Sequence, residues 1–317
     1  MRYPPGFVFA RQTRRLAFML FLGCVLATSG LAREPEHSTL FDSFAAVDAT
    51  FLDASQIASS GAAFEALVHH ASPCGATATP KQDRARCVVD SLFASDQLVT
   101  VAEPGDPESS TVTSVLVSHR GNCAALTALV LAVADRVNVP MEAVVFPRHV
   151  VVRARGKDDY LFEVLSRGSM LSMAQLRRQL GADGAHDTRV RPNAFLAYYI
   201  DNLAVRFADA GRTDRAQPLF ERAIQAGPHV ARVRFNYGTF LLGLNRLEPA
   251  REQLHRAVRL DSHNAPGWAN LGVALARLGE TDEARRCFER ALRYDPGNRI
   301  AADNLKTLSR DGPPPPR

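Results

Sequence analysis

The sequence has little of what binds nucleotides, metals or nucleic acids. No glycine-rich loop of the kind that cradles phosphates occurs, and no cluster of cysteine and histidine has metal-ligand spacing. The adjacent pair His69 and His70 lacks cysteine or acidic partners at ligand spacing, which favours a surface position over a metal site. The net charge is +5, but acidic residues are interleaved with the arginines and no aromatic-studded basic stripe accompanies them. We therefore expect no metal, no organic cofactor and no nucleic-acid partner.

Long apolar runs are also scarce, and the one that stands out lies at the N-terminus. Arginines precede the uncharged run 16–26, and the small residues of Gly30-Leu31-Ala32 have the spacing of a cleavage site. This pattern is typical of a secretory signal peptide over residues 1–32, and it predicts a periplasmic or secreted protein without stable membrane insertion after cleavage. An uncleaved anchor is one alternative. Lipidation at Cys24 is a weaker one, because the residues around it fit a lipoprotein signal loosely.

Only five cysteines occur, and three of them lie between the signal and the repeats described below. In an oxidising compartment an odd number leaves one thiol unpaired. Cys74 and Cys87 flank a short loop-like stretch, so we expect a disulfide between them that stabilises the fold by about 3 kcal/mol. Two reduced thiols are the alternative. Pairing leaves Cys123 free, whereas Cys287 lies in a helical repeat where packing accounts for it.

Cys123 lies at the start of an expected helix. Gly121 relaxes the backbone, Asn122 is suited to the N-cap, and the apolar segment 124–137 continues as the helix. The unpaired amides and the dipole of a helix start favour a thiolate, which is the nucleophilic form of cysteine. The local sequence therefore predicts a reactive cysteine.

Two strand-like segments carry a histidine and an acid. The segments 149–155 and 160–165 are rich in β-branched and apolar residues and flank a turn signal that begins at Gly156. A turn centred on Gly156 sets Glu163 opposite His149 on one face of the sheet. The carboxylate would then orient the imidazole while its other nitrogen faces the thiol. A packed histidine and a solvated acid are the alternative.

These motifs, in this order, resemble the bacterial transglutaminase-like superfamily. The matching residues are Arg-Gly-Asn-Cys at 120–123, followed by an apolar helix, and Val-x-Phe-Pro-x-His at 144–149. The resemblance covers roughly residues 75–180. It implies a papain-like α+β fold, with N-terminal helices packed against an antiparallel sheet.

The resemblance also implies a catalytic triad. Cys123 matches the nucleophile, His149 the base, and Glu163 the acid, which in the family is usually Asp. Thiolate attack on an amide or ester carbonyl would give a thioester, and the sequence leaves open whether water or an amine accepts the acyl group. The alternative is a non-catalytic binding or scaffold protein in which this domain is a degenerate support.

Polar residues beside the nucleophile and the base are candidates for substrate binding. Arg120 and Asn122 precede the cysteine, and Arg148 stands before the histidine, where the family commonly has a small residue. Arg120, Arg148 and Arg153 could attract a substrate that bears a carboxylate, although surface arginines are the commoner explanation.

A repeat with a period of 34 residues fills the C-terminal part of the chain. Small and large apolar residues recur at fixed positions of this repeat, as in Ala216, Ala250 and Ala284 or Phe220, Leu254 and Phe288. Around Trp268 the sequence fits the tetratricopeptide pattern almost completely, which predicts an all-α solenoid. Its groove is expected to bind a protein or peptide; the alternative is that the repeats only buttress the first domain. The oligomeric state is left open.

These patterns divide the chain. After the signal we expect a transglutaminase-like domain at 33–190, with a linker candidate at 181–192. The segment 194–310 is expected to contain three repeats, at 197–230, 231–264 and 265–298, and to end in a capping helix. A disordered tail is expected at 311–317.

Overall fold

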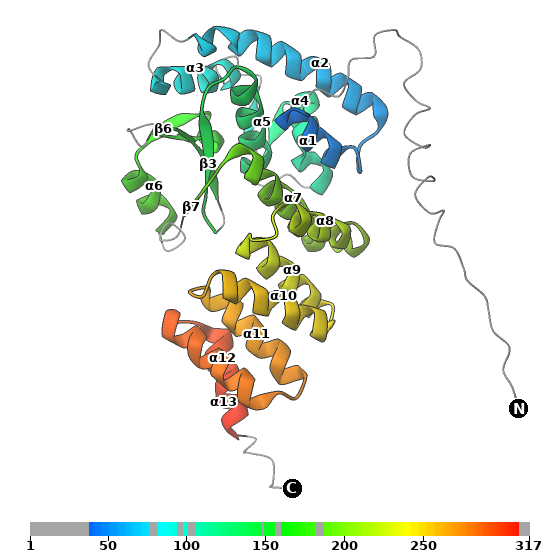
Figure 1. The fold of residues 1–317 in the computed structure, drawn as a ribbon, viewed down its shortest axis with the longest axis vertical. Coiled ribbons are helices and arrows are strands. Elements are labelled where there is room, and N and C mark those ends of the chain that lie inside the picture. Colours follow the sequence, from blue (N-terminus) through cyan, green and yellow to red (C-terminus); the bar gives the residue numbers. More distant parts are fainter. Residues whose placement is uncertain are drawn as a thin grey trace, which may run out of the picture. The chain divides into compact units, whose positions relative to one another are not determined.

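Figure 1 shows a computed structural model of the chain. It describes residues 38–76, 81–93, 98–100, 106–147, 149–155, 160–181 and 187–310. The expected signal peptide with Cys24, the tail at 311–317 and Arg148 lie outside the described residues. Among the described helices, none combines the length and the apolar character that crossing a membrane requires.

Helices build the N-terminal part of the first domain around a buried central helix. They are α1 (Leu40–Asp48), α2 (Ala54–Ala71), α3 (Lys81–Phe93), α4 (Val112–Ser118) and the central α5 (Cys123–Arg136), with short 3-10 turns η1 (Ser72–Gly75) and η2 (Pro107–Ser110). A short strand β1 (Val99–Thr100) pairs in parallel with β2 (Arg120–Gly121). Residues 124–134 of α5 are all buried. This helix is apolar on every side because α1 to α4 and the sheet surround it.

A five-stranded antiparallel sheet packs against α5. In spatial order its strands are β6 (Ser169–Leu171), β5 (Leu161–Glu163), β4 (Val150–Ala154), β3 (Met141–Val145) and β7 (Thr188–Val190). Val145 and Val152 belong to the core that contains α5, whereas Val144 and Val151 form a second cluster with Leu176 of α6 (Met173–Leu180). The period-two alternation thus buries both faces, and the predicted α+β fold is confirmed.

The register between β4 and β5 differs from the predicted one. Val152 pairs with Phe162 and Arg153 with Leu161, so each residue of β4 pairs two positions later along β5 than a turn centred on Gly156 would give. Glu163 is therefore not directly opposite His149, and that prediction was wrong. An even shift keeps the same side chains on the same face, because strand side chains alternate with a period of two.

Helix α7 (Pro192–Asp209) is shared by the two parts of the chain. It packs against α5 of the first domain and pairs with α8 (Thr213–Ala226) of the repeats. Residues 188–190 of the expected linker form β7, which pairs with β3 at the edge of the sheet. The first domain therefore passes into the repeats through a packed strand and helix.

Antiparallel helix pairs make up the repeats. After α7 and α8 come α9 (Ala231–Gly243) with α10 (Leu247–Leu260), α11 (Ala265–Arg277) with α12 (Thr281–Tyr294), and then α13 (Arg299–Arg310). Gly272 permits the close approach within the third pair, because a Cβ there would lie 2.5 Å from the Phe288 ring. The predicted α-helical repeats are confirmed.

The predicted disulfide is present. Cys74 in η1 and Cys87 in α3 are bonded, with their Cα atoms 5.5 Å apart. The thiols of Cys123 and Cys287 are free, and Cys287 is buried. The bond ties α3 to the end of α2, beside the central helix.

Tyr199 anchors the shared helix α7 to the first domain. Its hydroxyl donates to Asp48 Oδ1 at 2.6 Å and accepts the Val112 backbone N–H at 2.9 Å, and all three residues are fully buried. Replacing Tyr199 by phenylalanine removes a partner from two buried groups, the Val112 N–H and Asp48, although Asp48 keeps the Thr113 N–H at 2.9 Å, so we expect urea unfolding to show a loss of about 2 kcal/mol. The matched control Tyr237→Phe, which loses one bond to the exposed Glu221, should lose about 1 kcal/mol or less. Equal losses would contradict this account.

Candidate active site

Cys123 is the first residue of α5, and the residues before it set its position. Asn122 caps the helix, because its side chain accepts the Ala125 backbone N–H at 2.9 Å. Gly121 lets α4 and α5 approach, since a Cβ there would lie 2.5 Å from the Val115 side chain. The thiol is partly exposed, at the end of the helix where backbone amides have no intrahelical partner.

His149 precedes β4 and Glu163 ends β5, and their side chains meet. His149 Nε2 and Glu163 Oε2 are 2.5 Å apart, and the two side chains are only 11% and 9% exposed. The other carboxylate oxygen of Glu163 accepts the Leu165 backbone N–H at 3.0 Å, in the turn η3 (Val164–Ser166). Despite the shifted register, the acid still reaches the imidazole, because diagonal neighbours on a sheet lie within reach of long side chains. The carboxylate is fixed at both oxygens.

The imidazole of His149 lies between this acid and the thiol. Burial lowers the pKa of His149, but hydrogen bonds to Cys123 and Glu163 and the charges of both outweigh it and raise the pKa to about 9. Because Nε2 is engaged by Glu163, Nδ1 is the nitrogen available to the sulfur. The structure therefore brings the three predicted residues together, with an imidazolium beside the sulfur at neutral pH.

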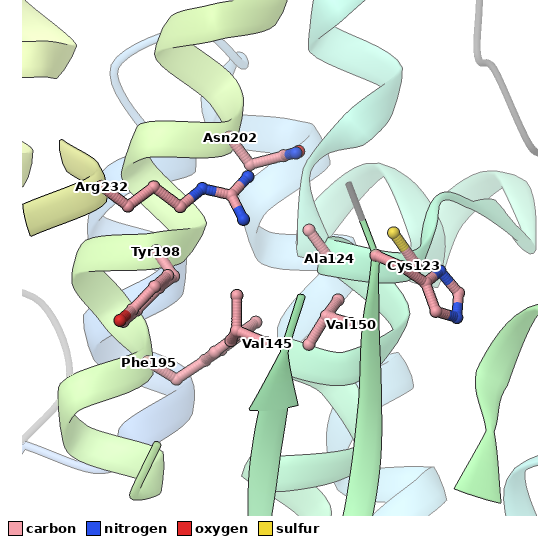
Figure 2. A pocket seen from close by; sticks show the side chains of 9 residues that line it. Cys123, Ala124, Val145, Val150, Phe195, Tyr198, Asn202 and Arg232 are labelled. Carbon is pink, nitrogen blue, oxygen red and sulfur yellow. The ribbon is translucent and has the colours of Figure 1, made fainter. Parts of the chain in front are cut away.

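A small pocket opens beside the sulfur. It is lined from α5, from the ends of β3 and β4, from α7 and from α9, by Cys123, Ala124, Val145, His149, Val150, Phe195, Tyr198, Asn202 and Arg232. Figure 2 shows the sulfur of Cys123 on the right, the side chains of Phe195 and Tyr198 on the lower left, and Asn202 with the guanidinium of Arg232 on the upper left. An acyl group at the thiol would enter a space that is apolar on one side and polar on the other.

The polar residues predicted to bind substrate are absent from this lining. Arg120 is exposed on β2, and Asn122 is buried as the cap of α5. Arg153 is buried and pairs with Glu142 at 2.6 Å. Arg148 lies outside the described residues.

The sequence reasoning missed Asn202 and Arg232, which the repeat helices supply. Arg232 follows the first residue of α9, more than 80 residues after the histidine whose pocket it lines. One signal was available: Asn202 and Asn236 are separated by one repeat period of 34 residues, so they occupy the same position on successive helices. No local pattern indicates that this position faces the cysteine.

Comparison with known families agrees with this architecture. Residues 62–206 match the family model described as the transglutaminase-like superfamily. Residues 207–260 and 265–298 match tetratricopeptide repeat models. The chain is a transglutaminase-like domain followed by tetratricopeptide repeats. The family match includes Cys123, His149, Glu163 and most of α7, so this helix belongs to the transglutaminase-like domain as well as to the first helix pair.

Solved structures similar to this chain include tetratricopeptide repeat domains. The first such domain of human RPAP3 is 21% identical over 37% of this chain and 92% of its own length, with a TM-score of 0.36. The second RPAP3 domain, in complex with an HSP70 peptide, is 27% identical over 36% and 94%, with a TM-score of 0.34. The Arabidopsis OM64 domain is 21% identical over 38% and 99%, with a TM-score of 0.37. No curated protein matches the sequence of this chain.

Proposed function

We propose that this protein is an exported cysteine hydrolase or acyltransferase that acts on a protein or peptide amide through a thioester. The observation that carries the proposal is the bond between His149 and Glu163 together with a pocket that both Cys123 and His149 line. A helix-start thiol, an imidazolium and a fixed carboxylate together make up an activated nucleophile.

In the first half of the reaction the thiolate of Cys123 attacks the substrate carbonyl carbon. The new S–C bond forms as the carbonyl π electrons move to oxygen, and the backbone N–H of Cys123 is a donor for that oxyanion. His149 then gives its Nδ1 proton to the departing amine, the C–N bond breaks, and a thioester remains. Glu163 holds the imidazole throughout.

In the second half His149, now neutral, takes a proton from the acceptor as it attacks the thioester. Water as acceptor releases a carboxylic acid, and an amine such as a lysine gives a new amide. Either acceptor regenerates the thiolate and the imidazolium, so the cycle closes without a cofactor or metal.

Export is proposed from two features. Residues 1–32 have the pattern of a secretory signal, and the disulfide Cys74–Cys87 is of a kind that persists in oxidising compartments. A role as the nucleophile would explain why Cys123 keeps a free thiol in such a compartment. The tetratricopeptide repeats are proposed to bind the protein or peptide that is the substrate, in the way that such repeats present a groove.

The reactivity of Cys123 toward iodoacetamide tests the proposal. We expect Cys123 to be alkylated at least about tenfold faster than an ordinary thiol at pH 6, where a thiol of pKa ~8.5 is almost entirely protonated. His149→Ala should remove most of this advantage, because it removes the cation that pairs with the sulfur. Peptide mapping of the full chain separates Cys123 from Cys287, which is buried and whose pKa burial raises to about 11.

A matched control is His229→Ala, since His229 is exposed and lies outside the pocket. This variant should alkylate Cys123 at the wild-type rate. A slow Cys123 whose rate is the same in wild type and in His149→Ala would overturn the enzyme proposal and favour a binding or scaffold protein.

A further inference from the structure

Arg232 is held at the pocket by two hydrogen bonds. Its Nη1 donates to the carbonyl of Phe146 at 3.1 Å, and its Nε donates to Asp201 at 3.3 Å. Asp201 is fully buried and also accepts from Asn236 at 2.8 Å. The guanidinium is thus bonded to the residue after β3 and to α7, and Asn236 of α9 in turn holds the Asp201 carboxylate. Its side chain remains 29% exposed.

These bonds leave one end of the guanidinium directed at the pocket. Nε and Nη1 have partners, whereas Nη2 has none among the residues that the structure describes. Figure 2 shows the guanidinium projecting toward the middle of the pocket, next to the amide of Asn202. Asn202 Oδ1 accepts from Asn122 Nδ2 at 3.4 Å, which leaves the Asn202 NH₂ group as a second donor in the same lining, as in a site for a planar oxyanion.

In the proposed chemistry the thiolate of Cys123 pairs with the imidazolium of His149. The other cation among the nine lining residues, Arg232, has no carboxylate beside it in the lining. Asp201 offsets part of the arginine charge, but it lies behind Arg232, fully buried, and does not line the pocket. Burial raises the pKa of Asp201 to about 6, against the opposing effects of Arg232 and Asn236, so at neutral pH it is mostly ionised. An anionic group that enters the pocket therefore contacts Arg232 and not Asp201.

We propose that Arg232 and Asn202 form a carboxylate-binding subsite beside Cys123, so that the acyl donor carries a carboxylate close to the carbonyl that the thiol attacks. The inference rests on the proposed acyl transfer and names its substrate class. It also gives the repeats a direct part in substrate recognition, because α9 supplies the cation to a site in the transglutaminase-like domain. Arg232 is a specificity residue here, and the chemistry stays with Cys123 and His149.

Two alkylating agents of nearly equal shape test this subsite without a known substrate. The thiolate displaces iodide from iodoacetamide and from iodoacetate alike, and only the second agent carries a carboxylate. The measured quantity is the ratio of the Cys123 alkylation rate with iodoacetate to that with iodoacetamide, in the full chain at pH 7 and low salt. Replacing Arg232 by glutamine should lower this ratio about tenfold, equivalent to about 1.4 kcal/mol. The iodoacetamide rate alone reports whether the site is intact.

A matched control distinguishes recognition from simple anchoring. Arg222 also joins a repeat helix to the first domain, through a bond from its Nη2 to the Ala46 carbonyl at 3.2 Å, but it does not line the pocket. Arg222→Gln should leave the ratio unchanged. Asp201→Asn removes the charge that offsets Arg232 and should raise the ratio severalfold, a direction that a structural defect would not produce.

Protection experiments identify where the carboxylate belongs. N-acetylglutamine carries it at the chain end, the α-amide of N-acetylglutamate carries it on the side chain, and the α-amide of N-acetylglutamine carries none. We expect one of the two acids to slow iodoacetamide alkylation of Cys123 more than the neutral diamide does, in wild type but not in Arg232→Gln.

Three outcomes would overturn the subsite: a ratio that Arg232→Gln leaves unchanged, an equal fall in Arg222→Gln, or a ratio that Asp201→Asn lowers. If one of these outcomes occurs while Cys123 still reacts fast with iodoacetamide in a His149-dependent way, the proposed enzyme activity stands and only the carboxylate-binding subsite is rejected. A slow iodoacetamide reaction in wild type would remove the enzyme proposal itself.

Discussion

Replacing Glu163 by glutamine is expected to slow acyl transfer at Cys123 by a factor of about 10² to 10⁴, the usual contribution of a positioned acid–base group. The reason lies in the two bonds of the Glu163 carboxylate. One oxygen meets His149 Nε2 and the other accepts the Leu165 backbone N–H at 3.0 Å. In the glutamine variant the Leu165 backbone N–H still needs an acceptor, so the side-chain amide oxygen turns toward it. The amide NH₂ then faces Nε2.

This orientation sets the wrong tautomer of the imidazole. With a donor opposite it, Nε2 of His149 must act as an acceptor, so the ring proton of the neutral imidazole moves to Nδ1. Nδ1, the nitrogen that Glu163 leaves available to the sulfur, can then no longer take a proton from the thiol or from an attacking water. Glutamine has nearly the volume of glutamate and keeps the bond to Leu165. We therefore expect the reaction rate to fall without a comparable loss of folding stability.

Acetyl transfer from p-nitrophenyl acetate measures both halves of the reaction. The initial burst of p-nitrophenolate reports acylation of Cys123, and the later steady release reports hydrolysis of the acetyl thioester, where the base is needed most. Glu163→Asp, which restores the acid usual in the family at a shorter reach, should lose less than Glu163→Gln.

The sheet offers a matched control for this variant. The Glu142 side chain is 11% exposed, against 9% for that of Glu163, and pairs with Arg153 at 2.6 Å without lining the pocket. Glu142→Gln should therefore cost stability but leave both rates close to wild type. If Glu163→Gln acylates and deacylates at wild-type rates, Glu163 is not the orienting acid.

Features set by short stretches of sequence were predictable here. Asn122 caps a helix whose first residue is Cys123 because side chain and amide are only three residues apart. Cys74 and Cys87 are close enough in the chain for their pairing to be the economical choice. The repeats were visible because each helix pair buries the same positions of a 34-residue period.

Features that depend on long-range packing were not predictable from the sequence. The β4–β5 register depends on the centre of one turn, and a shift of that centre by a single residue moves every partner by two. Arg232 reaches the pocket because α7 packs against α5 and brings α9 next to the end of β3. Its local sequence, a polar helix start, has no signal for that contact. Conversely, Arg120 stands next to the active-site motif in sequence but points to solvent.

Raising the pH from 6.5 to above 9 is expected to remove about 3 kcal/mol of stability that His149 contributes. Burial alone would lower the pKa of His149, but its hydrogen bonds to Cys123 and Glu163 and their charges raise it from 6.5 to about 9. The folded state therefore binds this proton more tightly than the unfolded state. The stabilisation is complete below pH 6.5 and disappears as the pH rises through about 9, at about 1.4 kcal/mol for each unit of pKa difference.

The comparison of wild type with His149→Gln isolates this contribution. Asp48 and Asp201, whose pKa values burial raises to about 6, titrate in an overlapping lower range, but they are common to both proteins and cancel in the difference. The free energy of unfolding in urea, followed by circular dichroism, should differ most at pH 6 and least at pH 9.5. His229→Gln, at an exposed position, should differ from wild type by the same small amount at both pH values. If the difference between wild type and His149→Gln is independent of pH, His149 is not held as an imidazolium between Cys123 and Glu163, and the thiolate that the proposed chemistry needs would lack its counter-ion.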